Sequence, residues 1–166
     1  MTRAHGAYEI DDDRERIDLE LVHSWLATSY WSPGIAIERV RKTAANSAMV
    51  IGAYLNCAET PHPPTPSPRH SSGRGGVQVG YARVVSDKVT FSWIADVFVA
   101  PDHRGKGIGK AMVRFALGHP DFTPMKRWVL ATRDAHEVYT ELGFQPIDKP
   151  QNWMILRGEP TPEGSP

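Results

Sequence analysis

The chain has 166 residues, of which 19 are basic and 19 acidic, so its formal net charge is zero. This length suits one domain with a substantial core, and the lack of a basic surplus argues against nucleic acid or a membrane surface as a partner. The single cysteine, Cys57, excludes an internal disulfide and indicates a reducing, cytoplasmic compartment. The sequence shows no signal peptide at its start, and its apolar runs are too short to span a bilayer.

The first third of the chain predicts two helices between two strands. A strand is expected at 7–11, and the helix at 18–28 is predicted from an apolar stripe at helical spacing, formed by Leu19, Val22, Trp25 and Leu26. Pro33-Gly34 breaks the chain into a loop before a second helix at 35–46. The nearly continuous apolar run at 48–55 predicts a strand that is buried on both faces.

Residues 56–76 interrupt this pattern with a cluster of prolines followed by serine and glycine. Prolines lack the N–H that a sheet ladder needs, so the segment predicts an extended insertion, at about 57–76, between two strands. A proline-rich ligand for a partner is the alternative, although an expanded loop is favoured. The later elements are predicted as strands at 77–86 and 90–99, a helix from Ile108, a strand at 128–132, a helix from Asp134 to Gly143, strands at 144–147 and 153–157, and a frayed polar tail at 158–166.

A glycine-rich turn at 104–110 joins the strand at 90–99 to the following helix. Its three alternate glycines precede an apolar stripe at helical spacing, formed by Ile108, Ala111, Met112, Phe115 and Ala116. Such a turn lets the backbone approach a ligand and points the free N–H groups of a helix N-terminus at it. Arg104, Lys106 and Lys110 add positive charge, so the turn predicts a diphosphate cradle.

Two common phosphate motifs do not fit this turn. A Walker A loop needs Ser or Thr where Ala111 stands, and the dinucleotide fingerprint needs a glycine spacing that strictly alternating glycines do not provide. The pattern Arg104-x-x-Gly107-x-Gly109 resembles the acetyl-CoA-binding signature of the GNAT superfamily of N-acetyltransferases. A second motif, Tyr139-x-x-x-Gly-Phe on a predicted helix with a glycine C-cap, resembles the other hallmark of that family. An ordinary glycine-rich turn is the alternative reading of the first motif.

The resemblance covers nearly the whole chain outside the insertion and the tail. It implies a single α/β domain at 1–157 with the GNAT acyl-CoA N-acyltransferase fold, in which helices flank a mixed, mostly antiparallel central sheet. It further implies transfer of an acetyl group from acetyl-CoA to a primary amine by direct attack. The diphosphate of the cofactor would lie on the glycine turn, and the pantetheine arm would run beside 96–99, where the sheet splays open. The cofactor-binding residues expected on this basis are Val97, Phe98, Val99, Arg104, Gly105, Lys106, Gly107, Ile108, Gly109 and Lys110.

Three residues are candidates for proton transfer. Tyr139 would protonate the leaving thiolate, although the ring could instead simply pack beside Leu142. Asp96 is the expected base, because an acid in an apolar strand needs a partner or a task; a structural hydrogen bond is the alternative. His136 lies one helical turn before Tyr139 and could replace Asp96, although a surface histidine is the favoured reading. The chain departs from the family at Thr132, where many relatives carry asparagine.

The resemblance places the acceptor beside the loop between the first two helices, which holds Tyr30, Trp31 and Ser32. Aromatic faces there can bind a cation or a flat ring, but the loop could equally be a lid that packs on the core. The expected acceptor is a small-molecule amine; a protein lysine or N-terminus, or a non-catalytic acyl-CoA-binding module, are the alternatives. The apolar segment 153–156 suits either a homodimer contact or an internal strand. Scattered histidines, with no second histidine after His136-Glu137 to complete H-E-x-x-H, predict no metal site.

Overall fold

The computed structural model describes residues 1–56 and 75–156. It divides the chain into two compact units, Met1–Asp134 and Ala135–Pro166, each of which is described by itself. Most of the predicted insertion at 57–76 and all of the predicted tail at 158–166 lie outside the described residues. The single domain expected at 1–157 stays a prediction.

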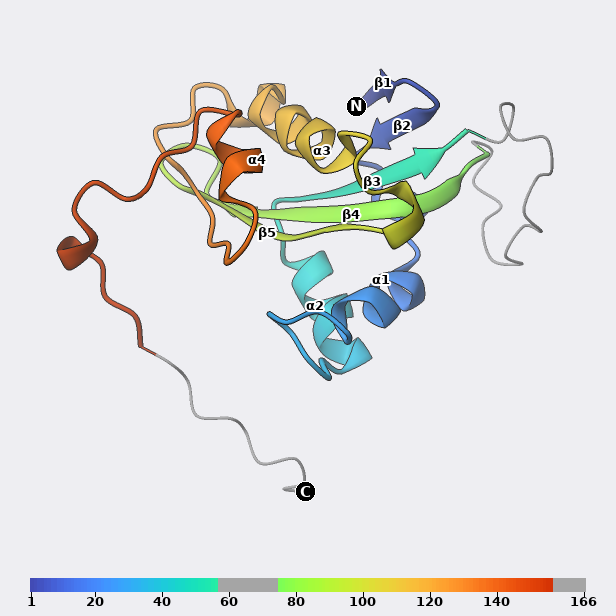
Figure 1. Ribbon diagram of the computed structural model, residues 1–166, viewed down its shortest axis with the longest axis horizontal. Helices are drawn as coiled ribbons and strands as arrows, with labels where there is room; N and C mark the ends of the chain where they lie inside the picture. Colours follow the sequence, from blue (N-terminus) through green and yellow to red (C-terminus); the bar gives the residue numbers. More distant parts are fainter. Residues whose placement is uncertain (57–74, 157–166) are drawn as a thin grey trace. The chain divides into compact units, whose positions relative to one another are not determined.

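The first unit is built on a sheet whose strands lie side by side in sequence order (Figure 1). Neighbouring strands are antiparallel except for the last pair, which is parallel. The sheet is therefore mixed and mostly antiparallel, as predicted. Its six strands among the described residues are β1 (Thr2–His5), β2 (Tyr8–Asp11), β3 (Met49–Leu55), β4 (Val77–Ser86), β5 (Ser92–Val99) and β6 (Trp128–Val129).

Helices cover both faces of this sheet. α1 (Leu19–Leu26) and α2 (Ile37–Ala45) lie on one face, and α3 (Ile108–Leu117) lies on the other (Figure 1). Asp18 caps α1 by accepting a hydrogen bond from the backbone N–H of Leu21 at 3.0 Å. Both predicted apolar stripes, on α1 and on α3, face the interior, since each provides the continuous apolar face that a helix packs against a sheet.

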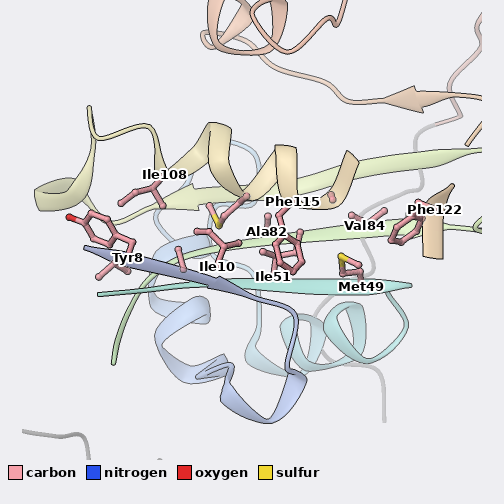
Figure 2. Close-up of a cluster of buried hydrophobic side chains, with 13 residues drawn as sticks. Tyr8, Ile10, Met49, Ile51, Ala82, Val84, Ile108, Phe115 and Phe122 are labelled. Atoms are coloured by element: carbon pink, nitrogen blue, oxygen red, sulfur yellow. The ribbon is translucent and has the colours of Figure 1, made fainter. Parts of the chain in front are cut away.

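Each face of the sheet has its own apolar core. The cluster under α3 combines side chains from β2, β3, β4 and α3, and Figure 2 shows it extending from Tyr8 and Ile108 to Phe122. The cluster under α1 and α2 includes Val50 and Tyr81. Because alternate residues of β3 enter the two clusters, the prediction that this strand is buried on both faces is confirmed.

The N-terminal hairpin was only half predicted. β2 matches the strand expected at 7–11, but β1 was missed, because three of its four side chains are exposed and show no apolar alternation. His5 pairs with Tyr8 across a two-residue turn, in which Gly6 has a φ of +57°. A glycine at this position of a two-residue turn is the sequence signal that could have identified the hairpin.

The later strands match the prediction up to β6. β4 has the predicted bounds, β5 begins two residues later than expected, and β6 ends at Val129 instead of at 132. The second unit contains α4 (His136–Thr140) and a single turn at Pro150–Asn152.

The predicted strands at 144–147 and 153–157 are wrong as far as the described residues go, because 144–147 and 153–156 have no strand conformation. Gly143 turns left-handed, with a φ of +90°, just before the first segment, and Pro146 within that segment lacks a ladder donor. The turn at Pro150–Asn152 stands directly before the second segment. Met154 and Leu156, exposed by 98% and 96%, show that apolar character alone did not decide the strand.

Replacing Gly52 with alanine is expected to lower the free energy of unfolding by about 1–3 kcal/mol. A Cβ at this position would lie 2.3 Å from the hydroxyl of Tyr54, whose ring is buried and lies 3.9 Å from the guanidinium carbon of Arg16. Urea unfolding followed by circular dichroism measures the loss. If the clash is the cause, a double-mutant cycle with Tyr54→Leu will show strong non-additivity, whereas additive losses would contradict it.

Candidate active site

β5 bends at a bulge in the middle of its length. Its register with β4 pairs Ala95 with Arg83 and Phe98 with Tyr81, so one residue of β4 opposes two of β5. Asp96, one of those two, has a φ of +53°. A non-glycine residue in this conformation is uncommon, and asparagine and aspartate adopt it most readily. The bulge therefore fixes the predicted base Asp96 in a left-handed conformation and redirects the strand beyond it.

The outer edge of β5 is paired over only a short part of its length. β6 pairs with Ser92 and Trp93, and among the described residues the register ends there. The stretch from Ile94 to Val99 thus presents strand N–H and C=O groups on the side away from β4. The predicted pantetheine arm would run along this edge; its binding there stays a prediction.

The glycine turn follows that edge after a single 3-10 turn at Pro101–His103. Gly105 and Gly107 both adopt left-handed conformations, with φ values of +74° and +75°, and Gly107 is the N-cap of α3. The first N–H groups of a helix have no acceptor within it, and the backbone bond from the Ala111 N–H to the Gly107 carbonyl begins the helical ladder. Successive N–H groups in such a turn can form a concave anion site; that this turn cradles a diphosphate stays a prediction.

The cradle also has the open space that a ligand backbone would need. A Cβ at Gly105 would meet no atom within 4 Å, and one at Gly109 would make only an ordinary contact, 3.8 Å from a methyl carbon of Val99. Ile108 is buried in the core under α3 and anchors the helix start. Lys110 lies in the first turn of α3.

Arg104 and Lys106 line the turn with positive charge. The Arg104 Nε donates a hydrogen bond to the Val99 carbonyl at 3.0 Å, and its guanidinium carbon lies 5.6 Å from the centroid of the Phe98 ring. Lys106 donates from Nζ to the Asp102 carbonyl at 3.3 Å. Phe98 also stacks on Trp25 of α1, at 5.2 Å between ring centroids. Direct contact of Arg104 with a diphosphate stays a prediction.

Asp96 has a partner that the sequence did not identify. The Arg83 Nε donates to its carboxylate at 2.5 Å, and the two side chains are exposed by only 17% and 10%. Arg83 also donates from Nη1 to the Ser47 hydroxyl at 3.5 Å. The ion pair compensates the charge of the mostly buried Asp96 carboxylate. It is therefore the kind of structural hydrogen bond that the sequence left open as the alternative to a role as base. The signal available in the sequence was a cation in the middle of apolar β4.

The hydroxyl of Tyr81 lies on the same face of the sheet as the Arg83 side chain. It stands two residues before Arg83 on β4, and its oxygen finds no hydrogen-bond partner among the described residues. Burial raises the pKa of the Tyr81 phenol well above its ordinary value, and the charge of Arg83 opposes that shift only in part. The phenol is therefore neutral throughout the physiological range.

The predicted acceptor loop is anchored by Arg133 and Asp134, the last two residues of the first unit. The Tyr30 hydroxyl accepts a hydrogen bond from the Arg133 backbone N–H at 3.2 Å and donates to the Asp134 carboxylate at 3.4 Å. The Arg133 guanidinium carbon lies 3.8 Å from the Tyr30 ring centroid, and Trp31 meets that ring edge-on at 4.9 Å. Tyr30 and Trp31 remain 42% and 41% exposed, and Ser32 is half-buried beside them.

The other two catalytic candidates lie in the second unit, on α4. Tyr139 is half-buried and meets the Phe144 ring edge-on, with 6.0 Å between centroids. His136 is exposed one turn earlier on the same helix. The predicted helix start at Asp134 is wrong, because α4 begins at His136 with Ala135 as its N-cap, and the alanine methyl group cannot accept a capping bond. The Asp134 carboxylate accepts from Tyr30 instead.

Residues 1–56 and 75–156 contain neither a metal-binding cluster nor a membrane-spanning helix. No group of three or more His, Cys, Asp or Glu side chains in this part of the chain could hold a metal ion. None of the helices described is long and apolar enough to cross a membrane.

Comparison with known proteins identifies the family. Residues 72–146 match the model of the acetyltransferase (GNAT) domain. A crystal structure from Xanthomonas campestris pv. campestris, described as belonging to the GNAT family, is 31% identical, with 93% of this chain and 96% of that one covered and a TM-score of 0.75. A crystal structure from Deinococcus radiodurans R1, at 16% identity and a TM-score of 0.63, covers 95% of this chain and 93% of that one and shares the fold.

A curated relative from Gibberella zeae, described as an acetyltransferase, is 23% identical over 111 residues. The match takes in 66% of this chain and spans 62% of the length of that relative. On the strength of the Xanthomonas structure and the matched domain model, the chain belongs to the GNAT family of N-acetyltransferases, which are acyltransferase enzymes.

Proposed function

We propose that this protein is an acetyl-CoA-dependent N-acetyltransferase whose acceptor is a primary amine of a small molecule. One observation carries the proposal: a left-handed glycine turn closely follows a strand whose outer edge, in the part of the chain that the structure describes, is paired only at its beginning. The turn suits a diphosphate, and the edge suits an amide-bearing arm that continues from it. Acetyl-CoA contains these two parts in that order.

The residues present fit such a cofactor. The N–H groups of the turn, from Gly105 to Lys110, would hold the diphosphate, with Lys106 adding charge. The edge of β5 from Val97 to Val99 would pair with the amides of the arm, in the way that an extended peptide adds to a sheet edge. The open space above Gly105 leaves room for the approach of a ligand.

Acetyl-CoA would supply the acetyl group as a thioester, and the C–S bond would break as the C–N bond to the amine forms. An alkyl ammonium is almost wholly protonated at neutral pH, so the nitrogen must first lose a proton. The Asp96 carboxylate would take that proton, while Arg83 holds the side chain in place. Tyr139 would donate its phenolic proton to the departing sulfur and would regain one from the second N–H of the acetylated nitrogen through solvent.

The fixed aromatic loop supports a small acceptor. Tyr30 is held by two hydrogen bonds and by the Arg133 guanidinium on its ring, so the loop has a defined position in the first unit. Because Arg133 already covers one face of Tyr30, the exposed Trp31 is the better surface for a flat or cationic acceptor. A bulky fixed wall of this kind favours a compact amine over an extended peptide.

Calorimetric titration with acetyl-CoA tests the cofactor assignment. The wild type is expected to bind, and Gly107→Ala is expected to bind about five- to thirtyfold more weakly, because an L-residue costs roughly 1–2 kcal/mol in this conformation. Gly34→Ala is the matched control: Gly34 has a φ of +68°, with nothing within 4 Å of an added Cβ, and lies outside the cradle. No binding by the wild type, or equal losses in both variants, would contradict the assignment.

Release of free thiol with a panel of amines then tests the acceptor. Turnover with a small amine would support the proposal. Turnover restricted to peptides would favour a protein acetyltransferase instead, and tight binding without turnover on any amine would favour a non-catalytic module.

A further inference from the structure

The N-terminal hairpin contacts the glycine turn, although about 100 residues of sequence separate them. His5, the last residue of β1, places its Nε2 2.9 Å from the Lys106 carbonyl oxygen. A carbonyl can only accept, so this imidazole nitrogen carries the proton and donates. Figure 2 shows Tyr8 of the same hairpin at the end of the core cluster where Ile108 begins α3.

The bond from His5 fixes one peptide unit of the turn. In a trans peptide the C=O of one residue and the N–H of the next point in opposite directions. With the Lys106 carbonyl directed at the hairpin, the Gly107 N–H points away from it, toward the side that His5 does not cover. A rotation of this peptide unit would turn that N–H toward the hairpin and break the bond to His5.

Close packing reinforces this orientation. A Cβ at Gly107 would lie 3.3 Å from the His5 Nε2, so the imidazole lies directly against the glycine backbone. Gly107 is thus required twice, for its left-handed φ of +75° and for the space that His5 occupies.

A second contact holds the start of the same loop. The Tyr8 hydroxyl lies 3.0 Å from the Nδ1 of His103, and the two rings meet edge-on at 5.7 Å. Burial, followed by the nearby charge of Lys106, lowers the pKa of His103, which favours a neutral ring that can accept from the tyrosine. The hairpin therefore holds the segment between β5 and α3 at two points, His103 and Lys106.

We propose that His5 is a positioning residue of the cofactor site: through the Lys106 carbonyl it aims the Gly107 N–H at the diphosphate of acetyl-CoA. This inference rests on the proposed function. His5 touches the cradle from behind, so its effect acts on the diphosphate and leaves the pantetheine arm on β5 unaffected.

The test compares two ligands that differ in the diphosphate. His5→Ala is expected to weaken acetyl-CoA binding about three- to tenfold, as for the loss of one hydrogen bond, and to leave the affinity for S-acetylpantetheine, which lacks the diphosphate, within about twofold of the wild type. His5→Gln, whose amide can donate to the same carbonyl, should restore most of the acetyl-CoA affinity. Calorimetry measures the first ligand and an NMR titration the second.

Thr2→Val is the control within the same strand, because it removes the hydrogen bond from Thr2 to Asp11 without touching the turn. It should bind acetyl-CoA as the wild type does. Equal losses for both ligands in His5→Ala would show a general structural effect and overturn the positioning role, as would unchanged acetyl-CoA affinity. A wild type that binds no acetyl-CoA would overturn the proposed function itself, which is a distinct result.

Discussion

Tyr139→Phe is expected to lower kcat by about 10²–10⁴-fold while the affinity for acetyl-CoA stays at the wild-type value. Phenylalanine keeps the edge-on contact with Phe144, so α4 should retain its packing. The change removes only the phenolic proton that the proposed mechanism delivers to the leaving sulfur. Steady-state thiol release, with the amine that the panel identifies, measures the effect.

The control for this variant is Glu137→Gln, an exposed position on the same helix, which should keep wild-type kcat. His136→Ala tests whether the histidine also takes part in proton transfer. A fall in kcat as large as that of Tyr139→Phe would show that it does. Wild-type kcat in Tyr139→Phe would remove the tyrosine from the mechanism and leave it a packing residue.

Asp96→Asn is expected to lower kcat by about 10²-fold or more, which is the second large effect. Asparagine tolerates the left-handed φ of +53° and can still accept from Arg83 through its amide oxygen, but it cannot take a proton. Stability and acetyl-CoA affinity should therefore match the wild type, as measured by thermal unfolding and calorimetry.

Asp96→Ala provides the contrast. It strains the bulge and leaves the mostly buried Arg83 without its carboxylate, so it should lose stability as well as activity. If Asp96→Asn keeps wild-type kcat while Asp96→Ala unfolds more easily, the aspartate is an anchor of the bulge and the base lies elsewhere.

The two largest departures from the prediction have local causes. Residues 144–147 and 153–156 were predicted as strands from their apolar content, but a strand also needs a partner edge and ladder donors. Pro146 removes a donor from the first segment, and the second, which follows the turn at Pro150–Asn152, has no strand partner among the described residues. Conversely, β1 was missed because the exposed strand carries little apolar signal, although Gly6 marked the turn.

The sequence by itself determined the features that depend on neighbouring residues. The alternating glycines permitted the left-handed conformations that Gly105 and Gly107 adopt, the stripe from Ile108 predicted an amphipathic helix, and the apolar run of β3 predicted burial on both faces. Each follows from backbone sterics or from the period of a helix or strand, which act within a few residues.

Only the tertiary structure decided which distant residues meet. The register of β4 and β5 brings Arg83 to Asp96, the hairpin brings His5 to Lys106, and the Tyr30 loop meets Arg133. A shift of one residue in a strand would turn Arg83 or His5 to the opposite face of the sheet, and no local propensity specifies that register. The glycine turn could therefore be recognised from the sequence, whereas the contacts that orient it depend on how the sheet assembles.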